Sequence, residues 1–175
     1  MQEQLEGRVW VVGDSVTTDD MYPGFAMKLS IPEAAQHIFY NLRPEWTKQV
    51  RPGDIVVAGR NFGLGSSRPV ASLFTHLGVQ ALIAEEFNSL FLRNAINFGL
   101  PALTVPGATA SFADGDTVRL HLTEGWCENV TTGTRLDAEP LPGFVREILD
   151  AGGILPKLAR EGYLPADAAK ALSGR

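Results

Sequence analysis

The chain has 175 residues, of which 45% are hydrophobic and 20% charged, and its formal net charge is −5 at pH 7. A chain of this length buries about 70% of its unfolded surface on folding, so it can form a core without disulfides or a structural metal. The acidic balance and the lack of a dense Lys/Arg cluster argue against nucleic acid as a partner, because neutralised phosphates supply most of that affinity. The N-terminus has no basic region and no run of about 18 apolar residues occurs, so we expect a cytoplasmic protein that stays off the membrane.

The sequence contains one cysteine, Cys127, and three histidines. A single cysteine excludes an intrachain disulfide, a Cys-x-x-Cys zinc site and an iron–sulfur cluster ligated by this chain alone. No base or metal-ligand spacing surrounds Cys127, so we expect a neutral structural thiol. His37, His76 and His121 show no paired spacing, and we therefore expect this chain to hold no metal.

Strands and helices alternate through the first 105 residues. Short runs of β-branched and aromatic residues predict strands, and capping residues before apolar residues at helical spacing predict helices. The predicted strands cover residues 7–13, 55–58 and 79–84, and the predicted helices cover residues 31–41, 69–77 and 88–98. This order indicates helical crossovers over a partly parallel sheet.

The pattern changes after Asp114. Short alternating segments over residues 117–122 and around 127–136, with glycine-containing turns, predict antiparallel strands in a second layer. A helix is predicted over residues 143–151, followed by a basic, Ala-rich tail that we expect to be frayed after about residue 160. No repeat or low-complexity linker marks a boundary. We therefore expect one α/β domain over residues 1–175, with β/β/α layering and a mixed sheet.

A Gly-rich loop over residues 63–68 is the strongest local signal. It lies between a predicted strand and a predicted helix, where backbone N–H groups and a positive helix end favour an anion. The loop lacks the Lys of a P-loop, and Arg68 stands where the dinucleotide fingerprint has its third glycine. The hydroxyls of Ser66 and Ser67 and the guanidinium of Arg68 suit a substrate carboxylate. The alternative is that the serines cap the helix and Arg68 forms a surface ion pair.

A second polar cluster follows the first predicted strand. Residues 13–20 hold three carboxylates and three hydroxyls. These groups could orient a catalytic serine or bind a divalent cation, although the alternating Asp ligands of an EF-hand are missing. The alternative is a set of Asx-turns and helix caps. Further along, Arg93 and Asn94 in an apolar helix predict a buried hydrogen-bond network that ties this helix to the Gly-rich loop.

Five segments of the chain, in order, resemble one known family. The chain resembles the small subunits of 3-isopropylmalate dehydratases, which are equivalent to the swivelling C-terminal domain of aconitases. The matching segments are residues 13–19, 56–63, 65–68, 91–101 and 147–153. The resemblance implies a swivelling β/β/α domain and a separate large subunit that carries a [4Fe-4S] cluster. It also implies that this chain binds no cofactor itself and is active only with that large subunit.

The resemblance further implies a hydro-lyase reaction in leucine biosynthesis. A 2- or 3-hydroxy diacid is dehydrated and then rehydrated on the other carbon. Ser66 matches the serine base that removes the proton next to a carboxylate, and Ser67 and Arg68 match residues that bind a substrate carboxylate. Thr18 and Asp19 match loop residues that line the site.

The segment Phe25, Ala26 and Met27 matches the loop that contacts the variable part of the substrate in this family. Isopropylmalate enzymes usually have Arg-Tyr-Leu at these positions. An apolar Phe25 in place of Arg disfavours a second carboxylate on the substrate tail. This argues against aconitase and homoaconitase activity and favours an alkyl-substituted malate.

The two residues that directly follow Arg68 depart from the family pattern. Pro69 and Val70 stand where the family usually has Glu-His. This departure keeps two alternatives open. One is a paralogous dehydratase small subunit for methyl- or dimethylmalate-type diacids, and the other is a non-catalytic module that binds anions.

Overall fold

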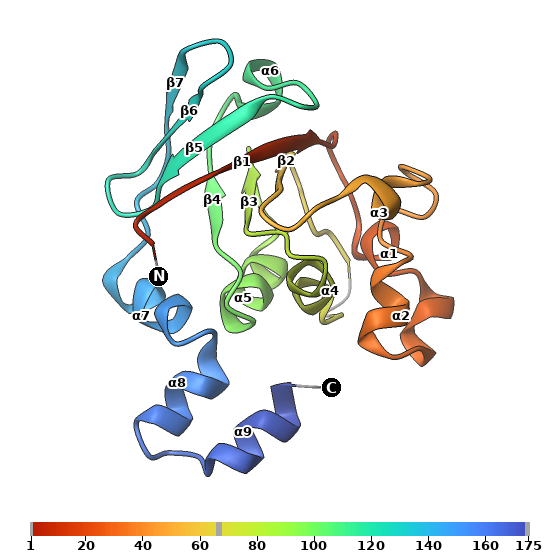
Figure 1. The fold of residues 1–175 in the computed structure, drawn as a ribbon, viewed down its shortest axis with the longest axis vertical. Helices are drawn as coiled ribbons and strands as arrows, with labels where there is room; N and C mark the ends of the chain where they lie inside the picture. The colour runs from red at the N-terminus through yellow and green to blue at the C-terminus, as the bar shows by residue number, and fades with distance from the viewer. Residues whose placement is uncertain (1, 66–67, 174–175) are drawn as a thin grey trace.

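The computed structural model describes residues 2–65 and 68–173. Within them the strands form one seven-stranded sheet in the order β4-β3-β2-β1-β5-β6-β7 (Figure 1). The neighbours from β1 to β4 are parallel, and β5, β6 and β7 are antiparallel. The strands are β1 (Gln4–Val11), β2 (Ile55–Ala58), β3 (Ala81–Ala84), β4 (Ala102–Thr104), β5 (Thr117–His121), β6 (Trp126–Asn129) and β7 (Thr134–Asp137). The predicted mixed sheet is confirmed.

β1 belongs to both halves of the sheet. Its residues 4–8 pair with antiparallel β5, and its residues 9–11 pair with parallel β2. Gly7 lies where the strand passes close to the turn before β2, and a Cβ there would lie 2.1 Å from the carbonyl oxygen of Gly53. Only glycine allows this approach. The predicted second layer is thus a continuation of the same sheet through β1.

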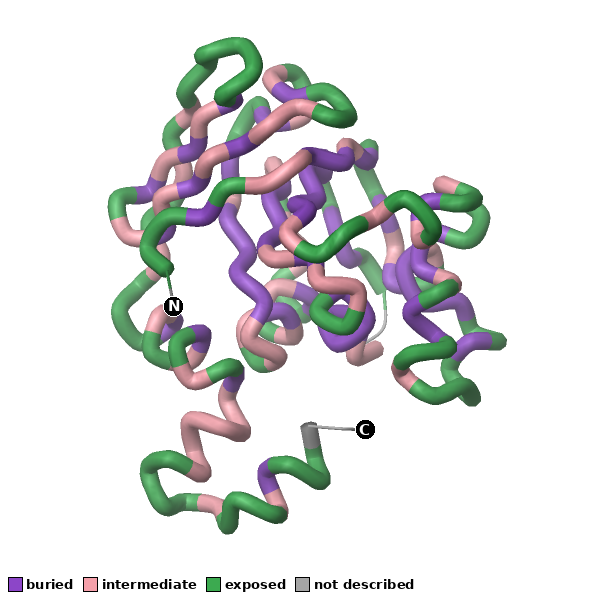
Figure 2. The backbone as a smooth tube through the Cα atoms, in the orientation of Figure 1, coloured by how far each residue is buried: buried purple, intermediate pink, exposed green. Residues whose placement is uncertain are grey.

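The sheet has an apolar core on each face of its parallel strands, which are almost wholly buried (Figure 2). Alternate residues of β2 point to opposite faces. Ile55 and Val57 belong to the core that includes Val118 of β5, whereas Val56 and Ala58 belong to the core beneath the helices. The antiparallel strands, the parallel strands and the helices therefore form the predicted β/β/α layers.

The helices on the outer face of the parallel strands are short. They are α1 (Thr18–Met21), η1 (Gly24–Lys28), α2 (Ile31–Ala35), α3 (Trp46–Gln49), α4 (Val70–His76) and α5 (Ser89–Asn97), and α6 (Ala108–Ser111) follows β4. The helix predicted over residues 31–41 is wrong beyond residue 35. Phe39 has a left-handed φ of 58°, and its amide donates to the carbonyl of Asp20 at 2.9 Å. Its ring packs in a buried aromatic cluster with Trp46 and Phe74, and this packing ends the helix.

The C-terminal residues form three helices, α7 (Gly143–Asp150), α8 (Ile154–Arg160) and α9 (Ala166–Ser173), of which α8 and α9 extend from the body of the molecule (Figure 1). Composition alone suggested a frayed tail after residue 160. Helix α9 instead buries Ala169, and it packs against α8. Lys157 of α8 forms ion pairs with Glu147 of α7 and with Glu161. These contacts are between segments, so the composition of the tail does not reveal them.

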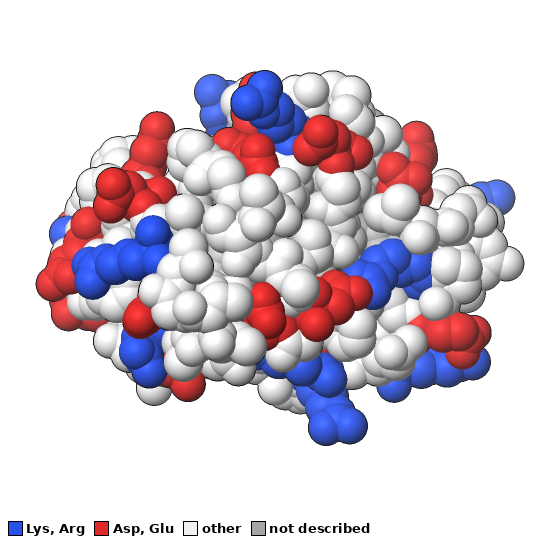
Figure 3. All heavy atoms as spheres, turned by 90° about the horizontal axis from the view of Figure 1, so that it is seen from above, with Lys and Arg blue, Asp and Glu red and all other residues white. Residues whose placement is uncertain are grey.

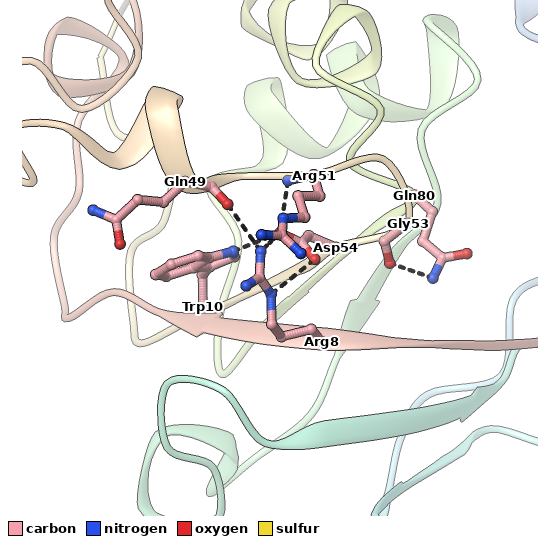
Figure 4. A network of polar contacts seen from close by, with 7 residues as sticks. All are labelled: Arg8, Trp10, Gln49, Arg51, Gly53, Asp54 and Gln80. Atoms are coloured by element: carbon pink, nitrogen blue, oxygen red, sulfur yellow. Dashed lines mark hydrogen bonds and ion pairs between the residues drawn. The ribbon is translucent and has the colours of Figure 1, made fainter.

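A buried polar network fastens β1 to the turn before β2 (Figure 4). Its centre is Asp54, which is 4% exposed and accepts hydrogen bonds from Arg8, from the indole of Trp10 and from the amide of Arg51. Gln80 donates to the carbonyl of Gly53 at 2.6 Å. Because this network lies at the amino end of β2, it is a structural feature away from the loops at the carboxyl ends.

The surface carries charges of both signs. On the face viewed in Figure 3, Lys and Arg alternate with Asp and Glu, and no broad patch of one sign is seen. In the described part of the chain, no helix combines the length and apolar character needed to cross a membrane.

Candidate functional site

Two loops at the carboxyl ends of β1 and β2 lie side by side. The amide of Ser15 donates to the carbonyl of Arg60 at 2.7 Å, and the amide of Thr18 donates to the carbonyl of Leu64 at 2.9 Å. Ligands of open α/β sheets usually bind at this edge. The polar cluster over residues 13–20 and the Gly-rich loop over residues 63–68 therefore form one candidate site, although their first residues are 50 positions apart in the chain.

Two glycines allow the Gly-rich loop to approach its neighbours. Gly65 has a φ of +126°, and a Cβ there would lie 2.7 Å from Oγ1 of Thr18. Gly63 has a φ of +84°, and a Cβ there would lie 2.2 Å from the ring of Phe91 on α5. A larger residue at Gly65 would push the loop away from Thr18, which is only 2% exposed, and one at Gly63 would push it away from α5.

Arg68 is held against the first short helix. Its Nη1 donates to a carboxylate oxygen of Asp19 and, at 2.8 Å, to the carbonyl oxygen of Tyr22. The side chain of Arg68 is only 17% exposed, whereas that of Asp19 is 71% exposed. The sequence pointed to Arg68 and Asp19 but not to Tyr22, because a backbone carbonyl leaves no signal in residue identity.

Ser66 and Ser67, the predicted base and its neighbour, lie outside the described residues. The residues that flank them, Gly65 and Arg68, both contact the turn that carries Thr18 and Asp19. The roles of the two serines therefore rest on the sequence.

Three of the other polar residues in the first loop have structural partners. Thr17 and Asp20 form a capping box at the start of α1, in which the amide of Asp20 donates to Oγ1 of Thr17 at 3.1 Å. The amide of Arg60 donates to Oδ1 of Asp14 at 2.8 Å. The caps and turns that the sequence offered as an alternative thus account for these residues, and they leave Thr18 and Asp19 facing the Gly-rich loop.

The predicted specificity segment forms η1, and its side chains alternate in exposure. Ala26 is fully buried, whereas Phe25 and Met27 are 54% and 48% exposed. The ring of Phe25 packs edge-on against His37 and Tyr40, with centroid distances of 5.0 and 5.4 Å. Of the three residues, only Phe25 and Met27 present a side chain to solvent.

The buried network predicted around Arg93 and Asn94 is only half correct. Oδ1 of Asn94 accepts from the amide of Ala71 at 3.3 Å, which ties α5 to the first turn of α4. Arg93 is exposed, and its side chain has no hydrogen bond or ion pair with any residue that the structure describes.

The groups that could hold a metal or react as nucleophiles are few. Cys127 is fully buried, and this desolvation raises the pKa of its thiol to about 12, so the predicted neutral thiol is confirmed. Among the described residues, no group of three or more His, Cys, Asp or Glu side chains is arranged to hold a metal ion. A lone buried cysteine also cannot ligate an iron–sulfur cluster, which takes several thiolates.

Comparisons with known proteins agree with this fold. Residues 22–108 match the family model of the aconitase C-terminal domain. The 3-isopropylmalate dehydratase small subunit 1 of Methanopyrus kandleri is 42% identical over 93% of this chain and 96% of its own length. The homoaconitase small subunit of Methanothermobacter thermautotrophicus is 44% identical over 89% of this chain and 91% of its own. A crystal structure of 3-isopropylmalate dehydratase from Methanocaldococcus jannaschii has a TM-score of 0.86 and 32% identity, covering 94% of this chain and 99% of that one.

The fold and the paired loops thus define an aconitase-type swivel domain. The chain belongs to the aconitase C-terminal domain family and, within it, to the small subunits of 3-isopropylmalate dehydratase type. The resemblance stated from the sequence is confirmed.

Proposed function

We propose that this chain is the small subunit of a cytoplasmic hydro-lyase that interconverts alkyl-substituted malates by dehydration and rehydration, as in leucine biosynthesis. Residues 1–175 would form one swivel domain that acts with a large subunit. The observation that carries the proposal is the Arg68 guanidinium, held in place where the two loops meet at the carboxyl edge of the sheet. A planar, fixed guanidinium is suited to two-point binding of a carboxylate.

We propose that Ser66 is the base of the reaction. A serine hydroxyl is a poor base unless hydrogen-bond donors and positive charge stabilise its ionised oxygen. Arg68, two residues away in the chain, and the amides of the Gly-rich loop are the groups that would do so. The ionised serine takes the proton from the carbon next to a substrate carboxylate, and the hydroxyl leaves from the neighbouring carbon to give an unsaturated diacid.

We assign the iron–sulfur chemistry to the large subunit, because the only cysteine of this chain is buried and protonated. A [4Fe-4S] cluster bound there would supply a Lewis acid for the departing hydroxyl. The contribution of this chain is to bind the diacid, to hold the proton on Ser66, and to exclude water when the subunits close.

The proposed preference for an alkyl tail rests on η1. Phe25 and Met27 are exposed and apolar, so they would contact an alkyl group favourably and would leave a tail carboxylate without a partner. The names of similar relatives cover both isopropylmalate and homoaconitase enzymes at comparable identity, so overall similarity does not select the substrate.

The test is anaerobic co-expression with the large subunit, followed by assays on a panel of alkyl-malates, homocitrate and citrate. We expect turnover of one alkyl-malate, and a loss of at least about 1000-fold in kcat for Ser66→Ala in a complex with the same cluster content. Equal inactivity of wild type and variant in an intact, cluster-loaded complex would refute the enzyme and favour a binding module. Preference for homocitrate would refute the assignment of the substrate.

A further inference from the structure

The orientation of Arg68 divides its hydrogen-bond donors into two groups. Nη1 donates both to a carboxylate oxygen of Asp19 and to the carbonyl oxygen of Tyr22. In the described part of the chain, Nε and Nη2 have no acceptor. The N–H of Nε and one N–H of Nη2 point the same way and form the fork that binds a carboxylate at two points.

We propose that Asp19 is a positioning residue for Arg68 and does not bind substrate. With Asp19 and Tyr22 on Nη1, the Nε/Nη2 edge of the guanidinium is the edge that receives the substrate carboxylate. This inference rests on the proposed function for the identity of the ligand, but the geometry of Arg68 stands without it.

Charge supports this assignment. A carboxylate on Asp19 repels a carboxylate on the substrate, so direct contact between the two is unfavourable. Placed on the far side of the guanidinium, the same charge instead restrains an arginine side chain that has many rotamers when free. The backbone carbonyl of Tyr22, at the end of α1 where carbonyls lack helical partners, fixes the second direction.

The kinetic test uses the assembled complex and a double-mutant cycle between Asp19 and Arg68. Asp19→Ala removes both charge and acceptor, and we expect KM for the diacid to rise about 10- to 100-fold with kcat changed less than about 3-fold. Asp19→Asn keeps an acceptor oxygen and should recover most of the loss. Because Arg68→Lys removes the fork, adding Asp19→Ala to it should change KM less than about 3-fold. Glu86→Gln, at an exposed acid just after β3, is the charge-matched control and should behave as wild type.

Three outcomes would overturn the inference while the proposed function stands. Effects of Asp19→Ala and Arg68→Lys that simply multiply would show that Asp19 acts independently of Arg68. A fall in KM for Asp19→Ala would show that Asp19 occupies the substrate position. A loss confined to kcat, with Asp19→Asn as poor as Asp19→Ala, would assign Asp19 to the chemistry.

A second measurement does not depend on turnover. We use ¹⁵N NMR spectra of this chain, with Arg68→Lys for assignment. We expect separate Nη1 and Nη2 signals for Arg68, because the contacts of Nη1 hinder rotation about the Nε–Cζ bond. Asp19→Ala should merge them, while Glu86→Gln should not. Merged signals in the wild type, or no change in Asp19→Ala, would refute the positioning role even if the complex turned out to have no dehydratase activity.

Discussion

Arg8 and Asp54 meet in a two-point contact, in which Nε of Arg8 donates to Oδ1 of Asp54 at 3.1 Å and Nη2 donates to Oδ2 at 2.7 Å. The indole of Trp10 donates to the same Oδ2 at 2.7 Å. The carboxylate is therefore nearly enclosed by donors. This contact joins the middle of β1 to the turn before β2, and thus the shared strand to the parallel half of the sheet.

Removing the acceptor should destabilise the fold. Asp54→Ala leaves the indole N–H of Trp10 and one face of Arg8 without a partner, so we expect a loss of about 2 to 3 kcal/mol in the free energy of unfolding. Denaturant unfolding at pH 7 measures this. Glu139→Gln, at an exposed acid, is the control and should lie within about 0.5 kcal/mol of wild type. A similarly small effect for Asp54→Ala would contradict the role of the network.

The same carboxylate predicts a dependence of stability on pH. Burial acts to raise the pKa of Asp54, but the hydrogen bonds from Arg8, Trp10 and the amide of Arg51 outweigh it, and the pKa lies below its usual value of 3.8. A lowered pKa stabilises the folded state above the usual value, and this contribution is lost as pH falls through the folded pKa. Between pH 5 and 3, wild type should therefore lose more stability than Asp54→Asn. Parallel pH profiles for the two proteins would refute this.

Gly65→Ala tests the close approach of the two loops. The new Cβ would meet Thr18 Oγ1 at 2.7 Å in a backbone conformation that disfavours side chains, so the Gly-rich loop must shift. We expect kcat/KM of the complex to fall at least about 10-fold, because small displacements of catalytic groups are costly. Gly13→Ala is the matched control, since its Cβ meets nothing within 4 Å. Equal activity of both variants would show that the loops tolerate separation.

Cys127 should resist alkylation in the folded protein. With a pKa of about 12 against a usual value of 9.0, its thiolate fraction at pH 8 is lower by about 1000-fold, and burial also blocks access. Reaction with iodoacetamide should proceed only in denaturant. Labelling of the native protein at the rate of a free thiol would mean that β6 opens readily.

Phe25→Arg tests how η1 selects the substrate. A guanidinium at this half-exposed position offers a partner to a tail carboxylate and removes an apolar contact. The ratio of kcat/KM for homocitrate to that for the preferred alkyl-malate should rise by about 10-fold or more. Phe25→Leu, which stays apolar, should keep the original ratio. If the arginine variant also keeps it, η1 does not contact the substrate tail.

Local sequence patterns determined several secondary-structure elements of this protein, the state of its cysteine and its class. The runs at residues 55–58 and 88–98 predicted β2 and α5 to within a residue or two, because continuous apolar runs and capped amphipathic segments form the same element in most surroundings. The sequence also predicted a neutral Cys127 thiol, because no base or metal-ligand spacing surrounds this residue. It predicted the class of the protein as well, because five segments in order resemble one family.

Tertiary structure decided what depends on contacts between distant segments. The helix predicted past residue 35 ended because Phe39 packs in an aromatic cluster with Trp46 and with Phe74, which lies 35 residues further along the chain. The tail became helical because α8 and α9 bury surface against each other. The parallel pairing of β1 and β2 brings the polar loop over residues 13–20 next to the Gly-rich loop. This placement divides the polar loop into capping residues and candidate site residues. It also lets the carbonyl of Tyr22 hold Arg68. Backbone groups and long-range packing carry no residue signature, so these features exist only once the chain has folded.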